Sequence, residues 1–99
     1  AQPSSLPDFD ARAPLVGQQL VQLFAWDEAT FLRMTEGGPI RRIGHERWLR
    51  NVAVALGNAL RATRDAGEAG ALRAALATRA DDASALVREH VAWALAQGI

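Results

Sequence analysis

The chain has 99 residues and no cysteine, and its eleven basic residues, all arginine, balance eleven acidic ones. This length suits one domain with a single core. The absence of cysteine excludes disulfides, thiolate metal sites, iron–sulfur ligation and a cysteine nucleophile within this sequence, and zero net charge argues against a strongly basic nucleic-acid module.

The beginning of the sequence is rich in Pro and Ser and has no helical pattern. We interpret residues 1–13 as a linker from a longer protein and residues 14–99 as the folded domain, although removal of a signal peptide would give a similar start. No apolar run approaches the roughly 20 residues that span a bilayer, so we expect a soluble domain with no membrane partner.

Two helices are expected before residue 40. Val16, Leu20, Leu23 and Phe24 recur at helical spacing and predict a first helix over about residues 15–25. Asp27 is a suitable N-cap for a short second helix, which the Gly-Gly-Pro sequence at residues 37–39 ends.

The central helix, over residues 44–60, has the clearest period. Its two faces are an apolar face of Trp48, Leu49, Val52, Ala53, Leu56, Ala59 and Leu60, and a polar face of Arg47, Arg50, Asn51 and Asn58. Gly57 and Asn58 are both plausible C-cap residues, so we expect the helix to end between Gly57 and Arg61. If it continues, Arg61 joins the face of Arg47 and Arg50.

The last third of the chain predicts two more helices. Residues 61–70 have the composition of a loop, and Leu72, Ala75 and Leu76 then mark a fourth helix. Residues 80–83 form a turn, and Ser84 caps a fifth helix with a core-facing stripe of Val87, Val91, Ala94 and Leu95. No strand pattern occurs, so the predicted fold is all-α with about five helices.

An internal repeat appears when the chain is shifted by 39 residues, which aligns Trp48, Val52 and Leu56 with Val87, Val91 and Leu95. This period lies near the lower edge of the roughly 40–47 residues of HEAT and armadillo units, and predicts a short HEAT-like stack of helix pairs. A bundle of four or five helices with coincidental similarity is the alternative.

Positive charge is concentrated in residues 40–64. This segment has a formal charge of plus five, from Arg41, Arg42, Arg47, Arg50, Arg61 and Arg64 against Glu46. Arginine binds phosphate well because its planar guanidinium donates two parallel hydrogen bonds. An anionic, phosphate-bearing ligand is therefore one candidate for this segment. The alternative is a solvated charged face on which Glu46 pairs with Arg42 or Arg50.

The run TEGGPIRRIGHERWLRNVAVALGNA, with LVREHVAWALA near the end of the chain, resembles the C-terminal HEAT-like domain of epoxyqueuosine reductase. The resemblance covers roughly residues 14–97. It implies a cytoplasmic bacterial enzyme that reduces epoxyqueuosine to queuosine in the tRNA anticodon, using cobalamin and two 4Fe–4S clusters in upstream catalytic domains. The 99-residue segment would then be a monomeric accessory domain without catalysis or cofactors of its own, which helps hold the anticodon stem–loop.

We predict that the RNA contacts are made by Arg41, Arg42, Arg47, Arg50, His45 and Asn51. His45 is an auxiliary phosphate donor among the arginines, and Asn51 either donates to RNA or joins its helix to a neighbouring loop. The sequence suggests no catalytic residues and no metal site. A different class of function, a protein-interaction or interdomain docking module without RNA contact, is the competing interpretation.

The remaining aromatic and imidazole side chains have structural interpretations. Trp48 is expected in the core rather than in base stacking, and His90 is expected to be a hydrogen-bonded structural residue. Trp93 points away from the stripe of the fifth helix, so it packs under the fourth helix, contacts the catalytic domains or stacks on a base.

Overall fold

A computed structural model describes residues 17–98, and this part of the chain is helical without strands. The elements are α1 (Gly17–Phe24), α2 (Glu28–Met34), the 3₁₀ helix η1 (Pro39–Ile43), α3 (Gly44–Ala62), α4 (Ala66–Ala77) and α5 (Ala85–Ala96). The predicted all-α fold with five helices is confirmed. The predicted linker, and the first residues of the helix expected over residues 15–25, lie outside the described residues.

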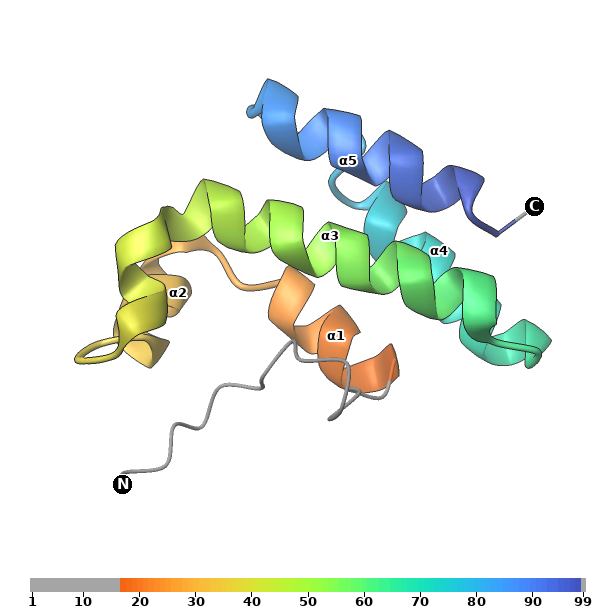
Figure 1. Ribbon diagram of the computed structural model, residues 1–99, viewed down its shortest axis with the longest axis horizontal. Coiled ribbons are helices and arrows are strands. Elements are labelled where there is room, and N and C mark those ends of the chain that lie inside the picture. The colour runs from red at the N-terminus through yellow and green to blue at the C-terminus, as the bar shows by residue number, and fades with distance from the viewer. Residues whose placement is uncertain (1–16, 99) are drawn as a thin grey trace.

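Helix α3 lies at the centre and contacts α1, α4 and α5 (Figure 1). Its buried side is formed by Trp48, Leu49, Val52, Ala53, Leu56, Gly57 and Leu60, and Ala59 is half-buried. Leu72 and Leu76 of α4 and Val87 and Val91 of α5 complete the same core. The helical period of residues 44–60 therefore identified the core-facing side correctly.

Helices α3 and α5 lie side by side and run in the same direction (Figure 1). Glu46 at the beginning of α3 bonds to Ser84 at the beginning of α5, Gly57 lies against Ala94, and Leu60 lies against Gly98. Each partner is 37 or 38 positions further along the chain, close to the predicted shift of 39. The parallel packing of α3 and α5, which α4 connects in the sequence, is compatible with stacked helix pairs. The HEAT-like assignment itself stays a prediction.

Gly57 is in the interior of α3, which corrects its expected role as a C-cap. A Cβ atom at this position would lie 2.9 Å from both Cα and Cβ of Ala94 and 2.7 Å from Cζ3 of Trp93. The glycine is therefore needed for the close approach of α5. The helix continues to Ala62, one residue beyond the predicted limit, and Thr63 is its C-cap.

The loop predicted over residues 61–70 is also wrong, because most of it is helical. Residues 61 and 62 belong to α3, and α4 begins at Ala66 after the N-cap Asp65, whose side chain accepts a hydrogen bond from the Gly67 amide. Alanine-rich sequence supports a helix well enough for the two glycines at 67 and 70 to be tolerated.

The two N-caps expected from the sequence are confirmed. Asp27 accepts a hydrogen bond from the Thr30 amide, and Ser84 accepts one from the Val87 amide. The hydrogen bonds from Thr30 hold the pKa of the Asp27 carboxyl below its usual value. The charged cap therefore stabilises the protein above the ordinary aspartate pKa, and this contribution is lost as the pH falls through the lowered pKa.

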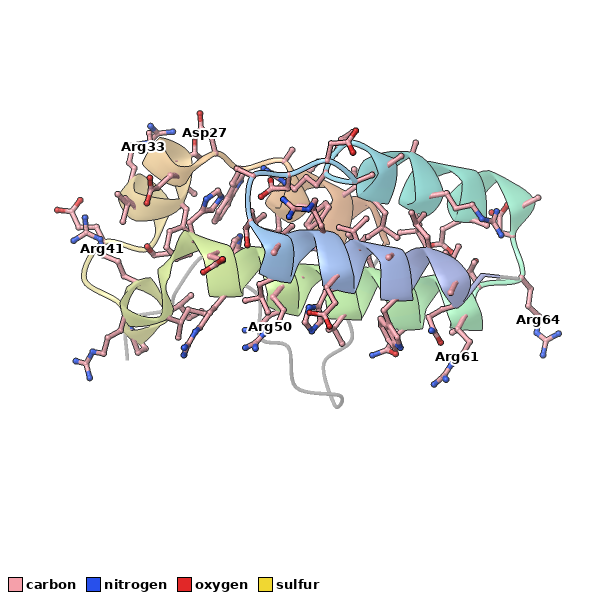
Figure 2. All side chains as sticks on the ribbon, turned by 90° about the horizontal axis from the view of Figure 1, so that it is seen from above. Asp27, Arg33, Arg41, Arg50, Arg61 and Arg64 are labelled. Carbon is pink, nitrogen blue, oxygen red and sulfur yellow. The ribbon has the colours of Figure 1, made fainter. Side chains whose placement is uncertain are left out.

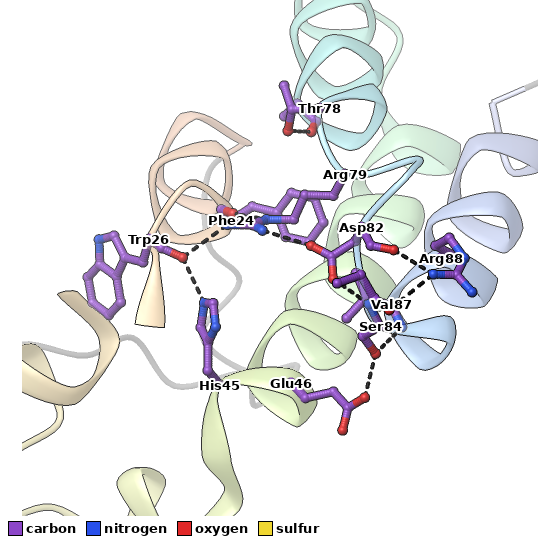
Figure 3. A network of polar contacts seen from close by, with 12 residues as sticks. Phe24, Trp26, His45, Glu46, Thr78, Arg79, Asp82, Ser84, Val87 and Arg88 are labelled. Carbon is purple, nitrogen blue, oxygen red and sulfur yellow. Dashed lines mark hydrogen bonds and ion pairs between the residues drawn. The ribbon is translucent and has the colours of Figure 1, made fainter. Parts of the chain in front are cut away.

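His45 of α3 and Arg79, in the turn after α4, contact carbonyl groups at and just after the end of α1 (Figure 3). Arg79 donates to the carbonyls of Phe24 and Trp26, at 2.8 and 3.0 Å, and also pairs with Asp82. His45 contacts the Trp26 carbonyl through Nε2 at 2.8 Å. These contacts supply partners for carbonyls that have none within the helix.

None of the helices between residues 17 and 98 combines the length and apolar character needed to cross a membrane.

We predict that Gly57→Ala destabilises the protein although alanine favours a helix. The new methyl group would overlap the α5 backbone, and overpacking of this kind costs about 1–3 kcal/mol of unfolding free energy. Urea denaturation followed by circular dichroism measures the change. Gly70→Ala is the matched control, because nothing lies within 4 Å of its Cβ position in α4, and we expect it to stabilise by about 0.4–1 kcal/mol. If the two variants change the unfolding free energy equally, the close approach of α5 to α3 at Gly57 is contradicted.

We also predict that Arg79→Ala lowers the unfolding free energy by about 1.5–3 kcal/mol, since it removes hydrogen bonds from a charged donor to half-buried carbonyls. Arg79→Lys should recover only part of the lost unfolding free energy, because an ammonium group lacks the planar guanidinium that donates to both carbonyls. Arg61→Ala, which removes an exposed arginine with no hydrogen-bond partner among residues 17–98, should change stability by less than about 0.5 kcal/mol. If Arg61→Ala lowers the unfolding free energy as much as Arg79→Ala does, the hydrogen bonds of Arg79 do not stabilise the fold specifically.

Candidate nucleic-acid interface

The four arginines predicted to contact RNA lie on two successive elements. Arg41 and Arg42 are exposed on η1. Arg47 is exposed at the end of the first turn of α3, and Arg50 is half-buried about one turn later. Gly44, with a φ of 87°, redirects the backbone between the two elements. Side chains of a 3₁₀ helix are about 120° apart, so Arg41 and Arg42 point in different directions.

Helix α3 carries a polar strip on its outer side. Arg47, Arg50, Asn51, Asn58 and Arg61 fall within about 100° of its circumference, and Arg47 and Arg61 are about 21 Å apart along the axis. Figure 2 shows Arg50 and Arg61 projecting from the same edge of the molecule, Arg41 at one end and Arg64 at the other. Arg61 belongs to the strip because α3 continues past Asn58 to Ala62. From the sequence alone, this depended on where the helix ends.

The arginines differ in what they contact. Within residues 17–98, Arg73, Arg79 and Arg88 each donate to backbone carbonyl groups. By contrast, no hydrogen bond or ion pair to another residue of that range is made by Arg41, Arg42, Arg47, Arg61 or Arg64. Glu46, the acid expected to pair with Arg42 or Arg50, instead accepts a hydrogen bond from the Ser84 hydroxyl (Figure 3). The guanidinium groups of these five arginines therefore keep their donors for a ligand.

Asn51 holds Arg50 rather than a neighbouring loop. Its side-chain oxygen accepts a hydrogen bond from Arg50 Nε at 3.1 Å, and both side chains are half-buried. The two Nη groups of Arg50 have no hydrogen-bond partner among the described residues. This contact restricts the Arg50 stem and reduces the side-chain entropy that would be lost when a ligand binds.

His45 is turned toward the interior of the domain, away from the polar strip. Its Nε2 contacts the Trp26 carbonyl, and its ring lies 5.6 Å from the Phe31 ring. The imidazole therefore links α3 to the α1–α2 connection, and phosphate binding by His45 stays a prediction. His90 contacts the Leu86 carbonyl of its own helix through Nδ1 at 2.8 Å, consistent with the structural role expected for it.

The three tryptophans divide into a buried pair and an exposed one. Trp48 is fully buried, as expected, and stacks on the half-buried Trp26 with ring centroids 5.5 Å apart. Trp93 is 40% exposed and lies against Gly57 of α3, so it does not pack under α4 as one interpretation proposed. Sequence reasoning missed this placement, because it depends on the parallel contact of α3 with α5.

No described group of three or more His, Asp or Glu side chains is placed to hold a metal ion. Cysteine is absent from all 99 residues, so the chain offers no thiolate to an iron–sulfur cluster. The chain therefore lacks the cysteine ligands of the iron–sulfur clusters implied by the family resemblance.

Proteins similar to this chain share one name. The chain is 95% identical over all 99 residues to an epoxyqueuosine reductase of Alicycliphilus denitrificans, of which it covers 28%. Over 98% of its length it is 63% identical to one of Xanthomonas campestris pv. campestris, covering 25% of that protein. Over 93% of its length it is 50% identical to one of Escherichia coli K12, covering 22%.

The chain thus spans about a quarter of the length of these relatives. The identities confirm the resemblance to epoxyqueuosine reductases, and the HEAT-like character of the segment stays a prediction. No protein-family model matches the chain, and no solved structure matches it.

Proposed function

Because the chain fits a segment of epoxyqueuosine reductase, we propose that it is an accessory tRNA-binding domain of that enzyme, which helps hold the anticodon stem–loop. The segment is a partial piece of an oxidoreductase and has no catalytic role in this proposal. We assign the reduction, with cobalamin and two 4Fe–4S clusters, to the rest of the parent protein. In this proposal the parent is a cytoplasmic enzyme and the accessory domain does not self-associate.

The observation that carries the proposal is a row of guanidinium groups that have no carboxylate partner among residues 17–98. Arg47, Arg50 and Arg61 share one strip of α3, and no carboxylate of the described residues pairs with them. Arg41 and Arg42 lie just before this helix and extend the positive charge beyond its beginning. Such groups bind phosphates and release counterions, the main source of affinity for a nucleic-acid backbone.

The competing function is docking against the rest of the parent or another protein. Leu32, Met34 and Ile43, on α2 and η1, are each 37–41% exposed, which favours some apolar contact at that end of the molecule. The two functions use different elements, so both can hold at once. Binding to upstream domains that is insensitive to salt, with no tRNA binding, would favour docking alone.

The test is a titration of the 99-residue chain with tRNA at several salt concentrations, followed by fluorescence anisotropy of labelled tRNA. We expect affinity to fall as salt rises. Arg47→Ala combined with Arg50→Ala should weaken binding and lower the log–log salt slope by about 1.4–1.8, because two phosphate contacts of about 0.7–0.9 each are removed. Circular dichroism of the double variant verifies that it is folded.

Arg33→Ala combined with Arg73→Ala is the matched control, since it removes the same formal charge from exposed positions outside the basic segment. We expect this pair to leave the salt slope nearly unchanged. If both pairs lower the slope equally, the attraction depends on overall charge and the assignment to Arg47 and Arg50 is wrong. If the unaltered chain shows no tRNA binding at low salt, the tRNA-binding proposal itself is wrong.

A further inference from the structure

Trp93 is the one described tryptophan with a largely exposed side chain, 40% accessible, whereas Trp26 and Trp48 stack on each other inside the domain. The sequence of α5 alone does not explain its position. Its six-membered ring contacts α3, because Cζ3 would lie 2.7 Å from a Cβ atom at Gly57. The absence of a side chain at Gly57 therefore lets the indole lie on the surface of α3.

This contact places the indole beside the polar strip. On a helix of 3.6 residues per turn, Gly57 is about 20° in azimuth from Arg50 and about 40° from Arg61. Arg50 lies two turns before Gly57, and Arg61 lies about one turn after it. Figure 2 shows both arginines projecting from the edge that this strip forms. The exposed ring thus lies along α3 between two guanidinium groups.

Two neighbours of Trp93 on α5 form hydrogen bonds along their own helix. Gln97, one turn later, donates from its amide to the Trp93 carbonyl, and His90, one turn earlier, contacts the Leu86 carbonyl. Both side chains are thereby held along the α5 backbone. An aromatic face between cationic groups is the arrangement used for nucleotides whose bases are not paired, since the ring stacks on the base and the cations bind the flanking phosphates.

We propose that Trp93 stacks on an unpaired base of the bound RNA, while Arg50 and Arg61 contact the phosphates on either side. This inference rests on the RNA-binding role proposed above and makes it more specific, because a paired and stacked base in a duplex has no free face for the indole. The domain then distinguishes a single-stranded segment from a helical stem at this one position.

The test uses the 99-residue chain with a mixed-sequence single-stranded RNA of about ten nucleotides, and with a duplex of the same sequence. Removing one stacking residue weakens single-strand binding by about 5- to 150-fold. We therefore expect this loss for Trp93→Ala, with less than about a twofold change for the duplex. The salt slope should stay constant, because no phosphate contact is removed. Single-strand binding should also quench tryptophan fluorescence in the unaltered chain, and this quenching should disappear in the variant.

Two further variants separate stacking from folding. Trp93→Leu keeps an apolar side chain on Gly57 but cannot stack, so it should behave like Trp93→Ala, and Trp93→Phe should recover most of the affinity. If Trp93→Leu is folded and binds the single strand as tightly as the unaltered chain, the inference is overturned. In that case the loss of tRNA binding in the Arg47 and Arg50 double variant would still support the proposed function. If no RNA of any form binds the unaltered chain, both proposals fail.

Discussion

The close contact of α3 with α5 at Gly57 determines which surfaces of this domain are available for binding. It allows two parallel helices to approach until the Ala94 backbone lies where a side chain would otherwise be. The apolar side of α3 is then covered by α1, α4 and α5, and its opposite side stays open. Arg47, Arg50 and Arg61 face solvent as a consequence of how the core is filled. The same contact brings Trp93, from a distant part of the sequence, to that strip.

Hydrogen bonding divides the arginines into two groups with different tasks. Arg79 donates to carbonyl groups at and just after the end of α1, and Arg88 donates to carbonyl groups in the turn before α5. These side chains stabilise the fold and cannot easily serve a ligand as well. The arginines of η1 and α3 contribute little to the fold, so their accumulation in one segment needs another explanation. The phosphate binding that we propose is such an explanation, because arginine is well suited to that ligand.

The sequence predicted features that depend on local chemistry and failed where tertiary contacts decide. The apolar period of residues 44–60 was sufficient to identify the buried side of α3, and Asp27 and Ser84 were recognisable as caps from residue type and position. Gly57 was misinterpreted, because a glycine that ends a helix and one that admits a neighbouring helix have the same local sequence. The inward turn of His45 likewise depends on the Trp26 carbonyl, 19 residues away in the chain.

Few phosphate contacts make a weak site, and weakness suits a domain that acts as part of a longer chain. Four or five contacts support binding of roughly micromolar strength at best in isolation. In the proposed function the catalytic part of the parent holds the same tRNA. The second contact is then intramolecular, and its effective concentration is in the millimolar range for a short linker. A site that binds tRNA only weakly on its own can then help orient the anticodon without slowing product release. An unpaired base on Trp93 would add orientation that phosphates alone do not supply, because backbone contacts are similar along the strand.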